Sequence, residues 1–327
     1  MTRRIRPADD PAAIDEGARL LRAGALVAFP TETVYGLGAN AFDAAAVARV
    51  FEVKARPSFD PLIVHLAERS DLARVAATDD PRVEGLAARF WPGPLTLVLP
   101  RRPELPEIVT AGLDTVGVRV PAHAAACELI RAAGTPVAAP SANPFGYVSP
   151  TTAAHVAELL GDAVDLILDG GPCRVGLESS IVALAGGVPA MLRPGGVARE
   201  EIEEALGAPL AQSYPPAGGP LAPGQLARHY ATRTPVRILS AAAGPCPPGA
   251  GDRVGLLAWT DAPGRDGYAA VEILAPDGRA GTAATGLFAA LRRLDALGLD
   301  AILAEPCEER GLGLAIMDRL RRCAAKG

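Results

Sequence analysis

The chain has 327 residues, 49% of them hydrophobic and 21% charged, which is the composition of a folded protein with room for one large or two ordinary domains. A net charge of −5 and a pI near 5.5 argue against a body that binds nucleic acid non-specifically. The five cysteines are scattered without a CxxC pair, which argues against a zinc or disulfide framework and indicates a reducing cytosol. No apolar run approaches membrane-spanning length, so we predict a cytoplasmic protein without membrane contact.

The first predicted elements are an amphipathic helix over 12–23 and an apolar strand over 25–29. The strand runs into Thr31-Glu32-Thr33 and then Tyr35-Gly36-Leu37-Gly38, where hydroxyl groups and glycines indicate a backbone that a ligand approaches closely. The segment GLGANA fits the pattern G-x-G-x-x-A. It does not follow the strand at once, and the next strand lacks the expected terminal acid, so a dinucleotide site is disfavoured.

A helical pattern over 47–54 then brings two cations to a helix exit, because Pro57 ends the helix near Arg56. Only Lys54 and Lys326 are lysines among the 32 basic residues. This favours a specific need for the compact ammonium of Lys54, which arginine does not replace freely. The alternative is a lysine on a solvated helix end.

Two strands carry polar side chains among apolar neighbours. The strand over 62–66 contains His65, which on its own is typical of a satisfied core histidine. In the strand over 115–120, three valines share one face and Gly117 and Arg119 share the other. Arg119 therefore either faces a ligand lying over the strand or is a solvated arginine on an edge strand.

The strand over 137–139 leads into Ser141 and Asn143, which prolines bracket at a rigid strand end; plain turn chemistry is the alternative. Ser149 is predicted to cap a helix that begins at Pro150 and ends at Gly161, or to present its hydroxyl to an anion. The remaining elements predicted before residue 207 are helices over 70–90 and 199–206 and strands over 95–99, 164–168, 178–182 and 190–192. We predict one mixed α/β domain on a twisted sheet over 1–207, with ligands at its strand ends.

The composition changes at Ala208, since eight of the next seventeen residues are Pro or Gly, and we predict a linker over 208–234. The linker contains PGQLARHY, a basic-aromatic segment that either closes over a site or is a solvated tether. Alternating strands and helices over 235–327 predict a small, doubly wound α/β domain.

No Walker A sequence and no GxSxG motif are present. The constellation that stands out combines cations, hydroxyls and amides at predicted strand ends: Thr33, Lys54, Arg56, His65, Arg119, Ser141, Asn143, Ser179 and Arg193. Three arginines and one lysine among hydroxyls suit the binding of phosphate and carboxylate groups. Such a site acts by positioning and charge stabilisation rather than through a covalent nucleophile.

At these residues the chain resembles the two-domain threonylcarbamoyl-AMP synthases of the YrdC-type family. The motifs follow in the family's order: PTETVYGLG, K-x-R at Lys54 and Arg56, PLIVH, WPGPLTLVL, VGVRVP, S-x-N at Ser141 and Asn143, ESSIV, LRPG, PGQLARHY and GLGLAIMDRLRRC. The resemblance implies a YrdC-like twisted mixed sheet with a large concave site, followed by a small Rossmann-like domain. It implies a nucleotidyltransferase that forms threonylcarbamoyl-AMP and pyrophosphate from L-threonine, bicarbonate or CO2, and ATP with Mg2+. The partner implied is a tRNA-modifying transferase that uses the adenylate, with at most a weak contact to tRNA.

The resemblance also implies roles for residues. Lys54 and Arg56 would be catalytic. Threonine would be held by Thr33, His65, Arg119, Ala139 and Ser179, with Arg119 on its carboxylate. The ATP side would be lined by Arg56, Asp60, Thr115, Ser141, Asn143, Ser149, Arg193 and Tyr230, with 228–230 closing from the linker, and no metal would be bound by protein ligands.

Asp60 departs from the family, which commonly has Asn or His at this position. A carboxylate beside a triphosphate is unfavourable, so we expect Asp60 to reach the nucleotide only through Mg2+ or an arginine. An RNA-binding module without chemistry and an O-carbamoyltransferase-type domain are the alternative functions. The acidic pI argues against the first, and the lack of zinc-finger and acylphosphatase segments argues against the second.

Overall fold

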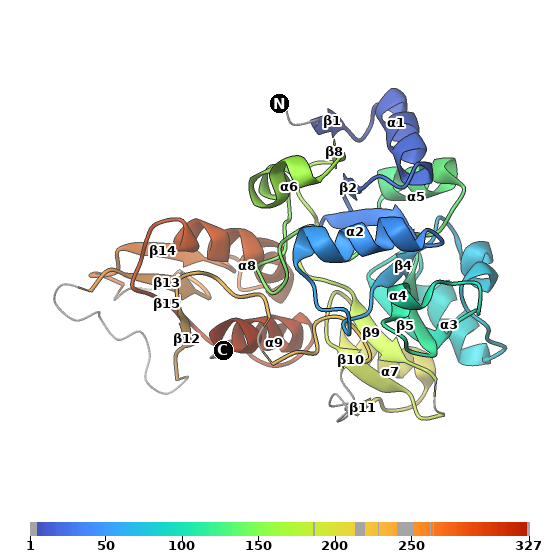
Figure 1. Cartoon of the computed structure of the whole chain (residues 1–327). Helices are drawn as coiled ribbons and strands as arrows, with labels where there is room; N and C mark the ends of the chain where they lie inside the picture. The colour runs from blue at the N-terminus through green and yellow to red at the C-terminus, as the bar shows by residue number, and fades with distance from the viewer. Residues whose placement is uncertain are drawn as a thin grey trace.

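The computed structural model describes residues 5–185, 187–212, 220–227, 229–240, 252–261, 263 and 265–325. Two bodies lie side by side, each built on its own β-sheet (Figure 1). A strand at Ala211–Gln212, inside the predicted linker, belongs to the sheet of the first body. The division into 1–207, 208–234 and 235–327 stays a prediction.

Within the described residues the first sheet has eleven strands in the spatial order β1-β8-β2-β3-β7-β4-β6-β5-β9-β10-β11. These strands are β1 (Ile5–Pro7), β2 (Val27–Phe29), β3 (Gly36–Asn40), β4 (Ile63–His65), β5 (Leu95–Pro100), β6 (Thr115–Arg119), β7 (Val137–Ala138), β8 (Leu166–Asp169), β9 (Ser180–Ala183), β10 (Ala190–Arg193) and β11 (Ala211–Gln212). Parallel and antiparallel neighbours are mixed, since β6 pairs with β4 in parallel and with β5 antiparallel. The mixed α/β class predicted from the sequence is confirmed.

Helices cover the two faces of this sheet unequally. The helices of the first body are α1 (Pro11–Arg22), α2 (Ala44–Lys54), α3 (Pro81–Phe90), α4 (Glu107–Thr110), α5 (Ala124–Ala133), α6 (Ala153–Leu160) and α7 (Arg199–Leu206), with 3-10 turns at Arg69–Arg74 and Gly161–Ala163. Residues of α2, α3, α6 and α7 share one core cluster on one face, while α1 and α5 pack with β2 and β8 on the other. Farther along that second face the apolar residues of β4, β5 and β9 meet Ala222 of the linker instead of a helix. In the described structure, this face of the sheet is packed by α1 and α5 at one end and by the linker at the other.

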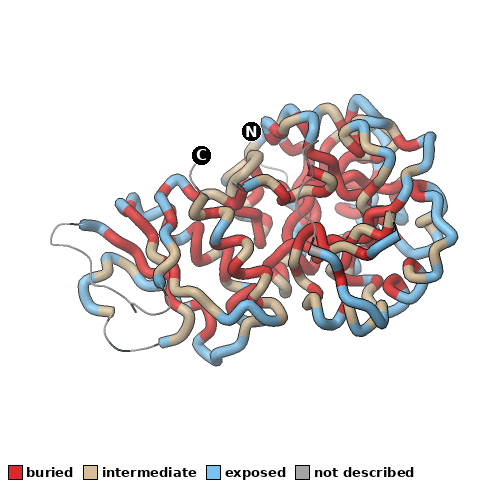
Figure 2. The backbone as a smooth tube through the Cα atoms, turned by 90° about the horizontal axis from the view of Figure 1, so that it is seen from below, coloured by how far each residue is buried: buried red, intermediate tan, exposed pale blue. Residues whose placement is uncertain are grey.

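In the part of the second body that the structure describes, a four-stranded parallel sheet has the order β12-β15-β13-β14, as expected for the predicted small α/β unit. Its elements are β12 (Val236–Ile238), β13 (Val254–Ala258), β14 (Ala270–Ile273), α8 (Ala280–Asp295), β15 (Ala301–Ala304) and α9 (Leu312–Ala324). Helices α8 and α9 lie between this sheet and the first body (Figure 1). Their core includes Val34, Leu177 and Tyr230, so buried backbone continues across the junction of the two bodies (Figure 2).

Several local predictions are wrong. Helix α6 begins at Ala153 rather than Pro150, and its N-cap is Thr152, whose hydroxyl accepts from the backbone N–H of His155. Residues 70–90 are not one helix, because Asp80 caps a new helix with Pro81 at its first position. The elements β1, β3, α4, α5 and β11 were not predicted.

The segment with Gly36 and Gly38 forms the strand β3. It pairs antiparallel with β2 and β7. A Cβ at Gly38 would lie 2.8 Å from the ring of Phe29 and 2.9 Å from Val137, so the glycine lets the neighbouring strands' side chains pack over β3.

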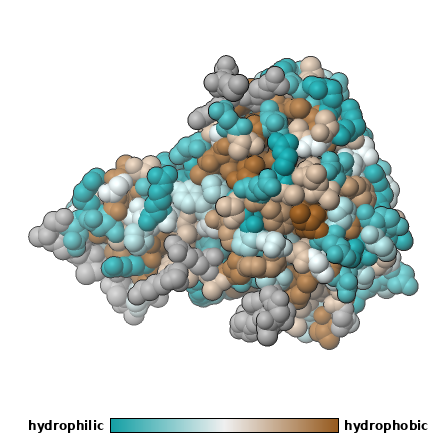
Figure 3. All heavy atoms as spheres, viewed as in Figure 1, coloured by the Kyte–Doolittle hydropathy of each residue, from teal (hydrophilic) through white to brown (hydrophobic). Residues whose placement is uncertain are grey.

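On the face shown in Figure 3, hydrophilic residues dominate the periphery and hydrophobic ones gather toward the middle. None of the helices in the described ranges is both long enough and apolar enough to span a bilayer.

Candidate active site

A cavity lies over β3, β4 and β6 of the first sheet, on the face that helices leave open, and segments 223–224 and 229–230 of the linker close one side. Nine of the residues predicted for the site line it: Thr33, Arg56, His65, Arg119, Ala139, Ser141, Ser179, Arg193 and Tyr230. Four more lie behind this lining and bond to residues in it: Lys54 and Asn143 bond to Ser141, Asp60 to Arg56, and Ser149 to Glu178. The structure therefore brings together residues that are far apart in the chain.

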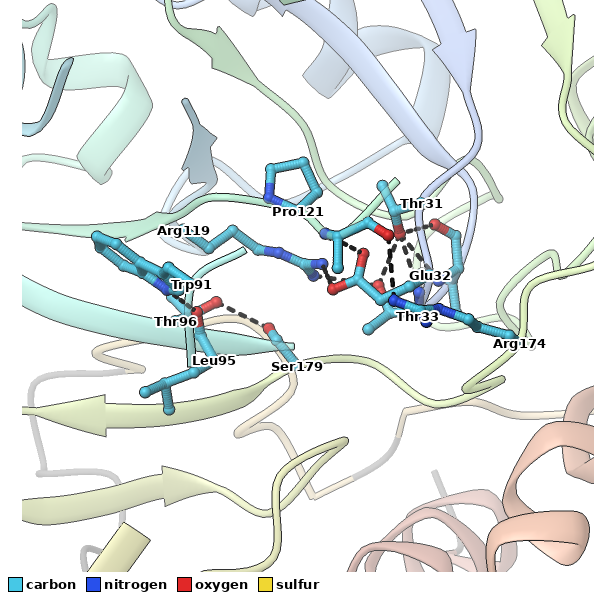
Figure 4. Close-up of polar contacts among 12 residues, drawn as sticks. Thr31, Glu32, Thr33, Trp91, Leu95, Thr96, Arg119, Pro121, Arg174 and Ser179 are labelled. Atoms are coloured by element: carbon cyan, nitrogen blue, oxygen red, sulfur yellow. Dashed lines mark hydrogen bonds and ion pairs between the residues drawn. The ribbon is translucent and has the colours of Figure 1, made fainter. Parts of the chain in front are cut away.

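Arg119 is held at one end of the cavity by two partners from the segment after β2 (Figure 4). Its Nη2 donates to Glu32 Oε1 at 2.6 Å and its Nη1 to Thr33 Oγ1 at 3.1 Å. Both charged side chains are buried, and the second oxygen of Glu32 accepts from the backbone N–H of Ala122 at 3.0 Å. The Nε of Arg119 has no hydrogen-bond partner among the described residues. The alternative of a solvated arginine on an edge strand is wrong, because β6 lies between β4 and β5.

Ser179 and Arg193 form a second polar group in the same cavity. The hydroxyls of Thr96 and Ser179 lie 2.8 Å apart, and Figure 4 shows the two side chains joined by a hydrogen bond. The guanidinium of Arg193 donates to the backbone oxygen of Ser179, to its hydroxyl at 3.2 Å, and to the carbonyl of Pro223 in the linker at 3.2 Å. Arg193 thus ties the strand end at Ser179 to the linker.

Lys54 is buried, so the alternative of a solvated helix end is wrong. Its ammonium donates to the backbone oxygens of Ser141, at 2.6 Å, and of Asn143. Burial, followed by the charge of Arg56, holds the pKa of Lys54 well below its usual range. Lys54 does not line the cavity: it fixes the loop that presents Ser141 there, and the side-chain amide of Asn143 fastens that loop to the carbonyls of Pro144 and Tyr147.

Arg56 and Asp60 form a buried ion pair, with Nη2 and Oδ2 3.0 Å apart. Arg56 also donates to the backbone oxygens of Asp60 and Pro61, and its guanidinium lies 5.7 Å from the ring centre of Phe145. Burial raises the pKa of Asp60, against the opposing effect of Arg56. Arg56 lines the cavity and Asp60 does not, so the arginine stands between this carboxylate and a ligand.

Glu178 and Tyr230 line the wall of the cavity that faces the second body, and Ser149 lies behind them. Ser149 donates its hydroxyl to Glu178 Oε1 at 2.5 Å, which explains why it does not cap a helix. Tyr230 is buried and its ring stacks on Phe288 of α8, while His229 lies edge-on to Phe145. The alternative of a solvated tether is therefore wrong for residues 229–230; Arg228 lies outside the described residues.

Sequence reasoning assigned no role to Glu32 or Glu178, both of which are buried beside predicted residues. Glu32 and Glu178 directly precede Thr33 and Ser179, so acids within the motifs PTETVYGLG and ESSIV were the available signal. Thr115 lies apart from the other predicted residues, at the start of β6. It borders a neighbouring, largely apolar pocket that shares Ile63 and Pro223 with the cavity.

His65 is neutral in this site. Burial, followed by the positive charge of Arg119, lowers the pKa of His65 to about 3, and its Nδ1 lies 3.3 Å from the carbonyl oxygen of Ile63. The ring of Phe29 meets the imidazole edge-on, with the ring centres 6.0 Å apart. The imidazole therefore offers the cavity an uncharged polar group at neutral pH.

This burial predicts a pH dependence of stability. A folded-state pKa below the unfolded value means that the contribution of His65 is complete above about pH 6.5 and is lost as pH falls toward about 3. Between about pH 7.5 and 5, we expect the free energy of unfolding of the wild type to fall by about 2 kcal/mol more than that of His65→Gln. Urea unfolding of both proteins at the two pH values measures the difference, and parallel losses would contradict a neutral, buried His65.

The chain matches known protein families over nearly its whole length. Residues 19–195 match the family model Sua5_yciO_yrdC, described as telomere recombination, and residues 197–325 match Sua5_C, described as threonylcarbamoyl-AMP synthase, C-terminal domain. A relative from Pyrococcus abyssi named threonylcarbamoyl-AMP synthase is 44% identical over 94% of this chain and 92% of its own. A relative of the same name from Bacillus subtilis is 42% identical over 95% of this chain and 92% of its own.

The solved structures agree with these matches. The crystal structure of P. abyssi Sua5 complexed with L-threonine superposes on this structure with a TM-score of 0.87 at 42% identity, covering 95% of this chain and 94% of that one. The resemblance stated from the motifs is thereby confirmed for both parts of the chain. The protein belongs to the Sua5/YciO/YrdC family and carries that family's threonylcarbamoyl-AMP synthase C-terminal domain.

Proposed function

We propose that this protein is an L-threonylcarbamoyladenylate synthase, a nucleotidyltransferase that makes threonylcarbamoyl-AMP and pyrophosphate from L-threonine, bicarbonate or CO2, and ATP. The enzyme class expected from the motifs is that of the named relatives. The observation that carries the proposal is one cavity in which Arg56, Arg119 and Arg193 stand among hydroxyl groups. Anionic substrates and a phosphoryl-transfer transition state need such fixed positive charges.

The threonine half of the cavity is the end at Arg119. We assign Arg119 to the substrate carboxylate, because Glu32 and Thr33 fix its guanidinium while its Nε is without a partner in the described structure. Thr33, His65 and Ser179 supply uncharged polar groups for the substrate's amine and hydroxyl, and Ala139 leaves room beside them. The relative solved with L-threonine supports the binding of threonine by a protein of this fold.

The ATP half is the side lined by Arg56, Ser141, Arg193 and Tyr230. Lys54 and Asn143 hold the loop of Ser141, and Ser149 bonds to Glu178 at the same wall. The apolar pocket beside Thr115 is the place we assign to the adenine base, since Leu221, Ala222 and Pro223 of the linker cover it. Binding ATP therefore requires the linker to leave Arg193 and reclose over the nucleotide.

The reaction proceeds by positioning. The threonine amine attacks CO2 and loses a proton, giving a carbamate. A carbamate oxygen then attacks the α-phosphorus of ATP, the bond to the bridging oxygen breaks, and pyrophosphate leaves. Arg56 and Arg193 stabilise the charge that develops on the phosphoryl oxygens, while Arg119 holds the carboxylate so that the amine stays near the α-phosphate.

Mg2+ enters as the MgATP substrate in this proposal. No cluster of three or more His, Cys, Asp or Glu side chains that could hold a metal occurs within the described ranges. The ion supplies charge neutralisation on the triphosphate, and Asp60 reaches the nucleotide only through Arg56 or through this ion. We further propose a cytoplasmic location, with a tRNA-modifying transferase that consumes the adenylate and at most a weak contact to tRNA.

The position of Asp60 predicts the effect of removing its charge. In Asp60→Asn, Arg56 keeps a neutral neighbour of equal size and its positive charge is no longer compensated, so we expect a MgATP Kd about threefold to tenfold lower. Because Arg56 is then buried without a counter-charge, we expect the free energy of unfolding of Asp60→Asn to be about 3 kcal/mol lower than that of the wild type. Calorimetric titration and urea unfolding measure the two effects; weaker MgATP binding would show that Asp60 itself serves the nucleotide.

The proposed activity is tested by incubating the purified protein with ATP, Mg2+, bicarbonate and L-threonine. We expect pyrophosphate release that requires both threonine and bicarbonate, together with a product of the mass of threonylcarbamoyl-AMP. Release of ADP would instead show a different ATP chemistry. No release, together with salt-dependent tRNA binding, would favour an RNA-binding module.

A further inference from the structure

Arg319 is a buried residue of the second body that reaches the wall of the cavity. It lies on α9, and its side chain is 0% exposed. Its Nε donates to Glu178 Oε2 at 2.9 Å, and its Nη1 donates to the backbone oxygen of Pro194 at 2.8 Å. The guanidinium also lies 4.9 Å from the ring centre of Tyr230, a cation–π contact.

All three contacts lead to residues of the proposed ATP half. Glu178 lines the cavity and accepts the hydroxyl of Ser149 with its other oxygen. Pro194 directly follows Arg193. Tyr230 lines the cavity from the linker, and its ring is packed between Arg319 and Phe288 of α8. One guanidinium therefore fixes a carboxylate, a strand end and an aromatic ring that surround the same ligand position.

The charged anchor of the threonine half is fixed by other means, and the hydroxyl of Ser179, which follows Glu178, pairs with that of Thr96. Arg119 has its hydrogen bonds to Glu32 and Thr33, both from the segment after β2. None of the hydrogen bonds or ring contacts of Arg319 involves these three residues. A change at Arg319 should therefore separate the two halves of the site.

Burial of Arg319 is costly, which argues against a purely stabilising role. The positive charge of Arg319 is balanced by Glu178 and by Asp318, whose Oδ2 lies 2.7 Å from Nη1 of Arg319. Its Nη2 has no hydrogen-bond partner within the described structure. A buried pair of this kind is often less stabilising than an apolar replacement, and an unsatisfied donor adds to the cost. A second contact between the bodies already fixes the segment before Glu178: the hydroxyl of Thr285 on α8 donates to the backbone oxygen of Arg174 at 2.8 Å.

Resting on the proposed function, we infer that Arg319 is a positioning residue for nucleotide binding, through which the second body completes the ATP half of the site. It sets the carboxylate of Glu178, the turn after Arg193 and the ring of Tyr230 in one arrangement. The second body is then a part of the active site rather than an appendage to it.

The test compares two equilibrium constants in the full-length chain. Calorimetric titrations with MgATP and, separately, with L-threonine are carried out on the wild type, Arg319→Gln and Arg319→Lys. We expect MgATP binding to weaken about tenfold or more in Arg319→Gln, while the Kd for L-threonine stays within about twofold. Arg319→Lys keeps a charge for Glu178 but loses the forked geometry, so a smaller loss confined to MgATP is expected.

Arg321→Gln is the matched control, because Arg321 lies on the same helix, is 52% exposed and pairs with Glu309 of its own body. It should bind both substrates like the wild type. Thermal unfolding of each variant checks folding, and Arg319→Lys carries the test if the glutamine variant does not fold.

Two results would overturn the inference: MgATP binding within twofold of the wild type in both variants, or equal weakening of both substrates, which is the mark of a structural role. Neither titration needs turnover. A wild type without threonine-dependent pyrophosphate release would contradict the proposed function and leave this comparison of MgATP and threonine binding intact.

Discussion

Replacing Lys54 with methionine should slow threonine-dependent pyrophosphate release by about a hundredfold to a thousandfold. The ammonium of Lys54 is buried and bonds to the backbone oxygens of Ser141 and Asn143, which places Ser141 at the cavity. Methionine nearly fills the volume but leaves both carbonyls without a donor, so the loop that faces the triphosphate loses its position. Steady-state rates at saturating substrates, alongside circular dichroism, measure the effect.

Two further variants define what the lysine supplies. Lys54→Arg should not restore the rate, because a guanidinium is larger and does not fit a slot shaped for one ammonium. Arg49→Gln is the control on the same helix, since Arg49 is half exposed and pairs with Asp165 away from the cavity. A Lys54→Met rate within threefold of the wild type would show that the loop with Ser141 and Asn143 keeps its position without the lysine.

The second large effect is expected at Arg119, and on threonine alone. In Arg119→Gln we expect the Kd for L-threonine to rise about a hundredfold, with little change for MgATP, because a desolvated carboxylate loses its charged partner. Arg119 is buried, and its hydrogen bonds go to Glu32 and Thr33 rather than to residues of the ATP half. Calorimetric titration of each substrate separates the two effects.

Controls for Arg119 come from the same part of the fold. Arg174→Gln should bind threonine normally, because Arg174 is exposed and its guanidinium donates, among the described residues, only to the carbonyl of Ala122, whose N–H bonds to Glu32. Arg119→Lys keeps the charge and covers the case in which the glutamine variant leaves Glu32 unpaired and unfolds. Equal weakening of threonine and MgATP in the lysine variant would contradict the assignment of Arg119 to the carboxylate.

Local patterns in the sequence predicted the elements whose cause is local. The alternation in β6 placed Arg119 and Gly117 on one face, and Pro57 ended α2 near the residue expected. The start of α6 was wrong because Ser149 and Thr152 are both good caps, and a partner 29 residues away, Glu178, takes the hydroxyl of Ser149. The glycines of β3 were expected to let a ligand approach the backbone, whereas Gly38 makes room for the side chains of Phe29 and Val137 from neighbouring strands.

The candidate site was predicted as a set of residue types rather than as a network of bonds. Motif order placed Lys54 and Asp60 beside the substrates, whereas the structure buries both behind the cavity, one on backbone carbonyls and one on Arg56. Glu178 and Arg319 are 141 residues apart in the chain, and no spacing rule connects them. Pairs that cross between two bodies depend on how the sheets dock, which sequence periodicity does not encode.

The central claim is that one cavity holds both threonine and ATP. A crystal structure of the protein with L-threonine and a non-hydrolysable MgATP analogue tests it most directly. The account predicts the threonine carboxylate within hydrogen-bond distance of Arg119 and the triphosphate at Arg56 and Arg193, under a closed Tyr230. An analogue bound elsewhere, such as the groove lined by Phe145, Tyr147 and Arg233, with the cavity empty, would contradict it.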